Sequence, residues 1–177
     1  MARKFDRKLI LEDGGEYFGY GFGAKEERVI EVVFNTSMAG YQEIISDPSY
    51  TFQGVVNTYP LIGNYGVNDE DDETKMPTIG GLIVAEYNDV PSNFRSRETL
   101  SEKLRRFSVP AIEGVDTRKL ARSIRDHGSR MGIITDADTS VKEGLEKIAK
   151  AGMRHDAVSL VSAKKAWRAP AENAKYK

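Results

Sequence analysis

The apolar pattern changes halfway along the chain, and this change restricts the fold class more than any other feature. In the first half, short β-branched and aromatic runs between Gly, Pro, Asn and Asp predict strands. In the second half, apolar residues recur at helical spacing. Strands that come first and helices that come later favour an α+β (mixed α/β) fold with helices covering one side. The expected strands are Lys8–Glu12, Glu16–Phe22, Val29–Phe34, Phe52–Tyr59, Thr78–Tyr87 and Met131–Thr135.

Three helices in the second half are predicted from their first residues. Thr99 and Glu102 have the spacing of a capping box before an apolar stripe. Ser140 and Glu143 repeat that spacing later in the chain. Asp116 can cap the helix between them. From about residue 162 the apolar periodicity ends, which is typical of a linker or tail.

Charge is divided unevenly between the two halves. Residues 1–90 have a net charge of −9 and residues 91–177 a net charge of +8. We expect the halves to intermingle, so that these charges meet across one fold.

The acidic stretch Asp69–Glu73 lacks the alternating spacing of a calcium loop, so it is expected to be a solvated loop. Arg118, Arg122 and Arg125 share one helix face. Such a face is usually only solvated, and if it binds a partner, an acidic protein is favoured over a nucleic acid.

Several kinds of site are excluded by composition and motif. The sequence has no cysteine, so it has no thiolate metal site and no cysteine nucleophile. Its two histidines, His127 and His155, are too few for a multi-histidine metal centre, and His127 is expected to meet carbonyls at a helix end. The glycines at positions 19, 21 and 23 fit neither phosphate-binding motif and suit a twisted hairpin.

No targeting or membrane segment is recognisable. Met1–Lys8 lacks the apolar core of a signal peptide, and the longest apolar run, Ile79–Ala85, is too short to cross a bilayer. We therefore expect a cytoplasmic protein with no membrane partner.

Polar residues, glycine and tyrosine gather in the segment Asn35–Asn68, where strands are expected to end. Loops at strand ends commonly carry binding groups, but the same residues also form ordinary turns. Residue chemistry alone leaves both interpretations open.

Five motifs in this order closely resemble the N-terminal half of the small subunit of glutamine-dependent carbamoyl phosphate synthase. The resemblance covers about residues 8–160. The motifs are LILEDG at Leu9–Gly14, FNTSMAGYQEIISDPSY at Phe34–Tyr50, NTYPLIGNYGVN at Asn57–Asn68, PSNFR at Pro91–Arg95 and VPAIEGVDTRKLARSIRDHG at Val109–Gly128.

The resemblance implies a three-layer β/β/α domain over residues 1–160 that packs on the large subunit. Residues 161–177 would be a linker toward a class I glutamine amidotransferase domain that this sequence does not contain. In the family, that domain uses cysteine, histidine and glutamate to release ammonia from glutamine. The large subunit then uses ATP, magnesium and bicarbonate to make carbamoyl phosphate for pyrimidine and arginine synthesis. No cofactor, metal or catalytic residue is implied within this chain.

One site residue is implied by the resemblance. Ser49, in the D-P-S-Y motif, matches a family position that contacts glutamine across the domain boundary, where a hydroxyl can donate and accept a hydrogen bond. Asp47–Tyr50 and Asn35–Gly40 are expected to face the amidotransferase domain. Two functions remain: a non-catalytic part of the synthase, with no glutaminase activity of its own, or a free-standing adaptor or regulator that reuses this domain.

Overall fold

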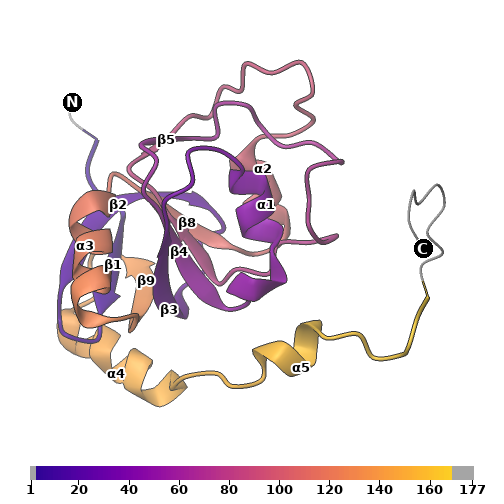
Figure 1. The fold of residues 1–177 in the computed structure, drawn as a ribbon. Helices are drawn as coiled ribbons and strands as arrows, with labels where there is room; N and C mark the ends of the chain where they lie inside the picture. The colour runs from indigo at the N-terminus through magenta and orange to yellow at the C-terminus, as the bar shows by residue number, and fades with distance from the viewer. Residues whose placement is uncertain (1–2, 169–177) are drawn as a thin grey trace.

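A closed sheet forms the centre of the protein (Figure 1). The computed structural model describes residues 3–168 of the 177. The barrel strands are β1 (Arg7–Leu11), β2 (Glu16–Gly23), β3 (Arg28–Asn35), β4 (Gln53–Asn57), β6 (Gly81–Ile83), β8 (Pro110–Glu113) and β9 (Arg130–Asp136). They follow the order β1-β2-β8-β6-β4-β3-β9, and β1 pairs with β9 to close the barrel. Two short strands, β5 (Leu61–Ile62) and β7 (Glu86–Tyr87), form a separate parallel pair.

Four neighbouring barrel strands, β3, β4, β6 and β8, run parallel, whereas the pairs made by β1, β2 and β9 are antiparallel. The carboxyl ends of the parallel strands therefore meet at one end of the barrel. Asn35 and Asn57 are register partners at the ends of β3 and β4. The loops that follow them belong to the polar, tyrosine-rich segment 35–68.

The barrel interior is filled by every second side chain of its strands, as expected for a closed sheet. On β1, Leu9 and Leu11 join the interior cluster, whereas Ile10 between them faces outward. Helix α3 (Thr117–His127) adds Leu120 and Ile124 to the interior cluster. The other fully buried members come from the remaining strands: Ile30, Val32, Val56, Ile83, Ile112 and Ile134.

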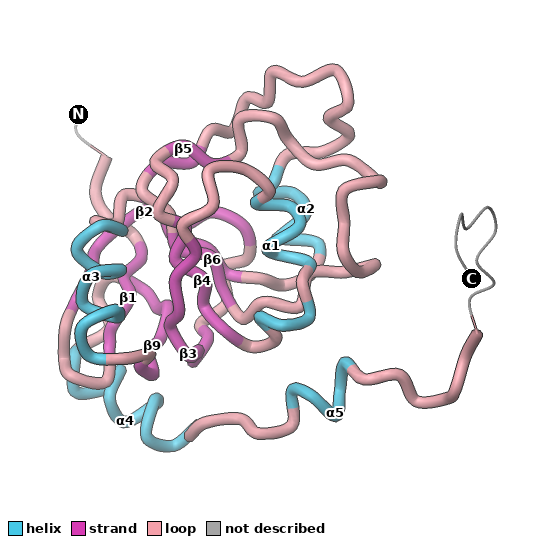
Figure 2. Tube along the Cα trace, in the orientation of Figure 1, coloured by secondary structure: helices cyan, strands magenta, loops and turns pink. Residues whose placement is uncertain are grey.

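Helices cover the outer faces of the barrel in two places. Helices α1 (Tyr41–Ser46) and α2 (Leu100–Arg106) pack over the wall that includes β4, β6 and β8, whereas α4 (Val141–Ala151) packs over β1, β3 and β9 (Figure 2). The α+β class is confirmed. The expectation that helices cover one side is wrong, because both outer faces are apolar and each needs a cover. The two expected β layers are opposite walls of one closed sheet.

Local signals located the helices well. Thr99 Oγ1 accepts a hydrogen bond from the Glu102 amide at 3.2 Å, and the Glu102 carboxylate accepts one from the Thr99 amide at 2.8 Å, so this capping box is confirmed. Ser140 caps α4, but the Glu143 carboxylate pairs with Lys147 at 2.8 Å instead of completing a box. One strand prediction is wrong: residues 78–87 contain two strands, β6 and β7, separated by Val84 and Ala85.

Opposite charges of the two halves meet across the fold, as expected. Lys103 pairs with Asp72 at 2.5 Å, and Arg95 pairs with Asp71 at 2.9 Å. The Lys103 side chain is only 3% exposed, so Asp72 neutralises a buried ammonium group. The interpretation of the acidic stretch as a solvated loop is therefore wrong for these two aspartates, which hold their loop against α2 and the segment before it.

The described chain leaves the barrel after α4. Helix α5 (Ala157–Val161) has no buried residue, and Figure 1 shows it lying away from the sheet. A domain boundary at residue 160 remains a prediction, and part of the predicted linker, residues 169–177, lies outside the described residues. Within residues 3–168, no helix combines the length and apolar character needed to cross a membrane.

Candidate functional site

Ser49 lies in an exposed turn beside a hollow of about 230 Å³. Its turn forms because the Asp47 carboxylate accepts a hydrogen bond from the Ser49 amide at 2.8 Å, and Pro48 has the fixed φ that such a turn needs. Within the described residues, the Ser49 hydroxyl has no hydrogen-bond partner. The side chain is therefore available to an outside group.

The far wall of this hollow is the segment Ala151–Arg154, through which the chain leaves the barrel. The Arg154 guanidinium lies 3.6 Å from the centre of the Phe52 ring, so a cation–π contact joins the exit segment to the turn after Ser49. Phe52 has a φ of 65°, which is a genuine outlier for a bulky side chain. Strained backbone of this kind often marks a functional site. Sequence reasoning missed both residues, because neither belongs to a local pattern.

The second predicted segment, Asn35–Gly40, is tied to the Ser49 turn. Asn35 Nδ2 donates a hydrogen bond to the Tyr50 hydroxyl at 3.1 Å. The amides of Gly40 and Tyr41 both donate to the Tyr65 hydroxyl at 3.0 Å, which fixes the end of the segment. Burial raises the pKa of Tyr65, so its hydroxyl stays protonated and neutral. The structure therefore holds the two predicted segments together.

A smaller hollow of about 170 Å³ lies between Asn35–Gly40 and the loop after β4. Asn57 lines it and is only 1% exposed, yet Asn57 Oδ1 has no hydrogen-bond partner among the described residues. A buried polar atom without a partner is costly and requires an explanation. Met38 on the rim is 78% exposed. The pattern of polar strand ends pointed to this region, but not to the unpaired amide.

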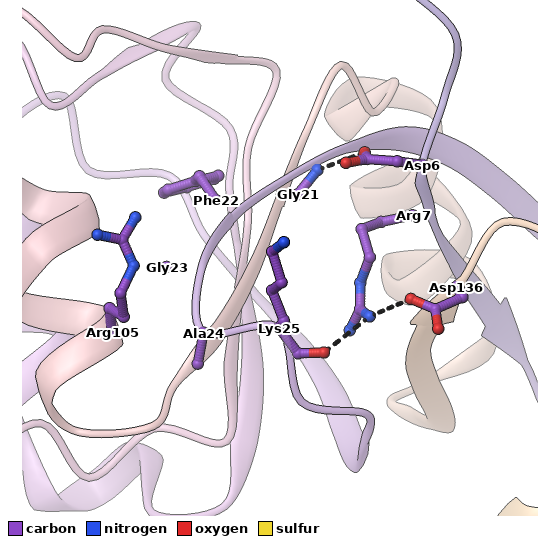
Figure 3. A pocket seen from close by; sticks show the side chains of 9 residues that line it. All are labelled: Asp6, Arg7, Gly21, Phe22, Gly23, Ala24, Lys25, Arg105 and Asp136. Carbon is purple, nitrogen blue, oxygen red and sulfur yellow. Dashed lines mark hydrogen bonds and ion pairs between the residues drawn. The ribbon is translucent and has the colours of Figure 1, made fainter.

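A hollow beside the glycine-rich strand β2 is lined by a structural ion-pair network (Figure 3). Arg7, which is 5% exposed, donates to Asp136 at 2.6 Å and to the carbonyls of Lys25 and Glu26. The Gly21 amide donates to Asp6 at 2.9 Å. Figure 3 shows Arg7 and Asp136 pointing toward each other, with the Asp6 carboxylate turned to the strand. The amide and the guanidinium are already engaged, which agrees with the hairpin interpretation of these glycines.

His127 has the structural role expected for it. Its Nδ1 lies 3.0 Å from the Ser123 carbonyl, in the last turn of α3. His155 is exposed and lies in the segment between α4 and α5. The described chain therefore places no histidine in the hollow beside Ser49.

The match to known proteins is extensive. Residues 9–134 match the family model described as carbamoyl-phosphate synthase small chain, CPSase domain. The carbamoyl phosphate synthase small chain of Fusobacterium nucleatum is 51% identical over 160 residues, which is 90% of this chain and 45% of that protein. The Oceanobacillus iheyensis small chain is 49% identical over 164 residues, and the pyrimidine-specific small chain of Bacillus subtilis is 46% identical over 164 residues. Both alignments cover 93% of this chain and 45% of the relative. The chain thus spans about half the length of these relatives.

Proposed function

The chain belongs to the carbamoyl-phosphate synthase small-chain family, and we propose that it acts as the non-catalytic N-terminal domain of that subunit in a cytoplasmic enzyme. In this role it holds an amidotransferase domain against the large synthetase subunit. The assembled enzyme makes carbamoyl phosphate from glutamine, bicarbonate and ATP, with ATP and magnesium bound by the large subunit. The Ser49 turn is the observation that carries the proposal.

Ser49 is well placed to contact a neighbouring domain. Its hydroxyl is exposed, has no partner in the described chain, and shares a hollow with the segment by which the chain leaves the barrel. A domain that follows this segment would lie close to the Ser49 turn. The hydroxyl would then accept a hydrogen bond from bound glutamine or donate one to it. In this way it would orient the substrate without attacking it.

The hollow beside Asn57 supports a role in ammonia delivery. Ammonia is a small neutral donor, and Asn57 Oδ1 is a buried acceptor without a partner in the described residues. We place the segment Asn35–Gly40 and this hollow against the amidotransferase domain, where they would shield the released ammonia from solvent.

The chemistry of glutamine hydrolysis must come from another polypeptide segment. The sequence contains no cysteine, so the chain cannot form the thioester that the family's amidotransferase uses. The isolated chain is expected to release no ammonia from glutamine above the uncatalysed rate.

Co-purification tests the docking role. The chain, carrying an affinity tag, is mixed with the large subunit of carbamoyl phosphate synthase from the same organism, and the retained protein is quantified. Retention at a stoichiometry near one to one is expected. If the large subunit is not retained, the docking role is wrong, and a free-standing adaptor becomes the better account.

The role of Ser49 is tested in the complete small chain assembled with its large subunit. Ser49→Ala should raise the KM for glutamine about two- to twelvefold, because one hydrogen bond contributes about 0.5–1.5 kcal/mol. Synthesis supported by free ammonia should keep its normal rate. Ser49→Thr retains the hydroxyl and should recover part of the loss.

Ser92→Ala is the matched control for this test. Ser92 is also exposed, but it does not line the hollow beside Ser49. An unchanged glutamine KM in Ser49→Ala, or an equal increase in the control, would remove Ser49 from the substrate site.

A further inference from the structure

A basic hollow of about 660 Å³ lies between the outer face of α3 and the loops after β3 and β4. Leu120 and Ile124 bury the inner face of α3 in the barrel core, which fixes the orientation of the outer face. The hollow is lined by three arginines from α3, two threonines from the loops, and two apolar residues. These are Arg118, Arg122, Arg125, Thr36, Thr58, Phe34 and Ala121.

The arginines of this hollow are poorly neutralised by the rest of the protein. Arg118 and Arg122 are exposed, and neither has an ion pair or side-chain hydrogen bond with any residue between 3 and 168. Among the residues that the structure describes, Arg125 pairs only with Asp126, its neighbour in sequence, at 2.8 Å. The described part of the chain places no carboxylate in the lining of this hollow. Other basic residues of this half, such as Lys103 and Lys147, are paired with acids of the first half.

The spacing of the arginines favours an elongated anion. With a rise of about 1.5 Å per residue, Arg122 lies about 6 Å along the helix axis from Arg118, and Arg125 lies about 10 Å from it. An elongated anion can follow the whole row, whereas a single phosphate would require the long side chains from both ends to converge on it. In an extended peptide, side chains on one face repeat every 6.6–6.8 Å or so, which matches the first interval. Carboxylates at alternate positions of an extended segment would therefore meet Arg118 and Arg122, and Arg125 extends the basic row beyond them.

The two threonines complete the recognition surface. Neither hydroxyl has a hydrogen bond with another described residue, so both can serve the main chain or the carboxylates of a bound peptide. Guanidinium groups form paired hydrogen bonds with carboxylates, and this geometry favours arginine over lysine at such contacts. The apolar Phe34 beside them offers surface to the aliphatic parts of the bound segment.

We propose that Arg118, Arg122 and Arg125 form a docking surface for an extended acidic segment of a protein partner. The inference deepens the proposed docking role, because it assigns one face of the domain to the contact and states the chemistry of the partner.

Charge reversal in the complete small chain tests this surface against the large subunit. The double variant Arg118→Glu/Arg122→Glu should bind the large subunit about tenfold more weakly or worse at low salt, and should lose most of its salt dependence. Lys142→Glu/Lys150→Glu on α4 changes the net charge equally at two exposed lysines outside the hollow. This control should bind within about twofold of the parent. Thermal unfolding of all three proteins verifies that each is folded.

A second measurement does not depend on the large subunit. Hexaglutamate, inorganic phosphate and a single-stranded oligonucleotide are titrated separately into the isotopically labelled chain, and the amide signals of α3 are followed by NMR. Hexaglutamate should shift these signals in the parent and fail to do so in the double arginine variant. Tighter arginine-dependent binding of phosphate or of the oligonucleotide would overturn the proposal.

The two measurements separate this proposal from the docking role. If the large subunit binds parent and double variant equally, the docking role stands and the arginine surface is wrong. If the large subunit does not bind but hexaglutamate binds at α3 through the arginines, the docking role is wrong and the surface stands. If the arginine and lysine double variants weaken binding to the large subunit equally, the effect is one of net charge alone. That result would also overturn the proposed arginine surface.

Discussion

Gly54 lies on β4 and faces the barrel interior, where it leaves room for one larger side chain. A Cβ atom added to Gly54 would collide with Cδ1 of Ile30 on the neighbouring strand β3 and would lie 3.0 Å from Cγ1. Ile30 is 1% exposed and belongs to the interior cluster. The interior thus has no spare volume at this point, and overpacking is expected to be destabilising.

Gly54→Ala should therefore lower the free energy of unfolding by about 1–3 kcal/mol. Ile30→Val removes the colliding Cδ1 atom and on its own should cost about 0.5–1.5 kcal/mol. The double variant should be destabilised by less than the sum, because the shortened side chain makes room for the new methyl group. Urea unfolding of the four proteins measures this coupling, and strict additivity would contradict the proposed collision.

At this scale, the sequence predicts what depends on near neighbours. The exposure of Ser49 follows from its turn between Asp47 and Thr51, and the role of His127 follows from its place at a helix end. The unpaired amide of Asn57 could not be predicted, because its burial depends on loops from other parts of the chain. The contact of Arg154 with Phe52 likewise joins residues about a hundred positions apart.

Among the elements, α4 is fastened to the barrel by a carboxylate as well as by its apolar face. Glu27, in the loop between β2 and β3, accepts a hydrogen bond from Lys147 of α4 at 2.8 Å and another from the Thr135 hydroxyl on β9. The hydrogen bond from Lys147, followed by that from Thr135, lowers the pKa of Glu27 below its usual value of 4.5. Ile148 packs the same helix against Ile10 and Ile133.

The depressed pKa of Glu27 predicts a pH dependence of stability. A carboxylate that is more acidic in the folded state stabilises the fold fully above its unfolded pKa, and this contribution is lost as the pH falls through the folded pKa. Glu27→Gln should therefore reduce stability at neutral pH by less than about 1 kcal/mol, and should make the loss below about pH 4.5 shallower.

Urea unfolding at a series of pH values measures this effect. Glu12→Gln is the control, because Glu12 is exposed and forms no ion pair with the described residues. If Glu27→Gln and the parent lose stability in parallel as the medium is acidified, the carboxylate does not fasten α4.

Helix boundaries were predictable because caps are local. Strand boundaries were less predictable. The apolar run around residues 78–87 gives no sign that its end leaves the barrel to pair with β5. Strand β8 was not predicted at all. It is four residues long and begins with Pro110, and its pairing with β2 and β6 depends on residues far away in sequence.

For the molecule as a whole, the described residues divide into a packed barrel and an exposed C-terminal segment. The core clusters include Ile148 of α4, whereas α5 contributes no buried residue. The stability of the barrel should therefore depend on α4 and not on α5.

Deletion of the chain from Ala157 onward should change the free energy of unfolding by no more than about 0.5 kcal/mol. Deletion from Ser140 onward should prevent stable folding, because it uncovers Ile10 and Ile133 on the outer face of the barrel. Circular dichroism during thermal unfolding distinguishes the two truncated proteins. A large loss of stability in the shorter deletion would show that α5 supports the barrel.

The α+β class could be predicted from the change in apolar pattern, but closure of the sheet could not. Closure requires β1 to pair with β9, more than a hundred residues later, and no local signal identifies that partner. The family resemblance supplied the general architecture, and in the structure its two β layers are continuous.

The closed strand order also limits how the barrel can assemble with other chains. An open sheet edge presents unpaired main-chain N–H and C=O groups, which can take up a strand from another protein. In the barrel, every strand has a hydrogen-bonded neighbour on each side. A partner therefore cannot join this sheet by strand addition, and two copies cannot join it edge to edge. Recognition at the barrel must depend on side chains and loops, so its specificity can be altered by substitutions that leave the main chain unchanged.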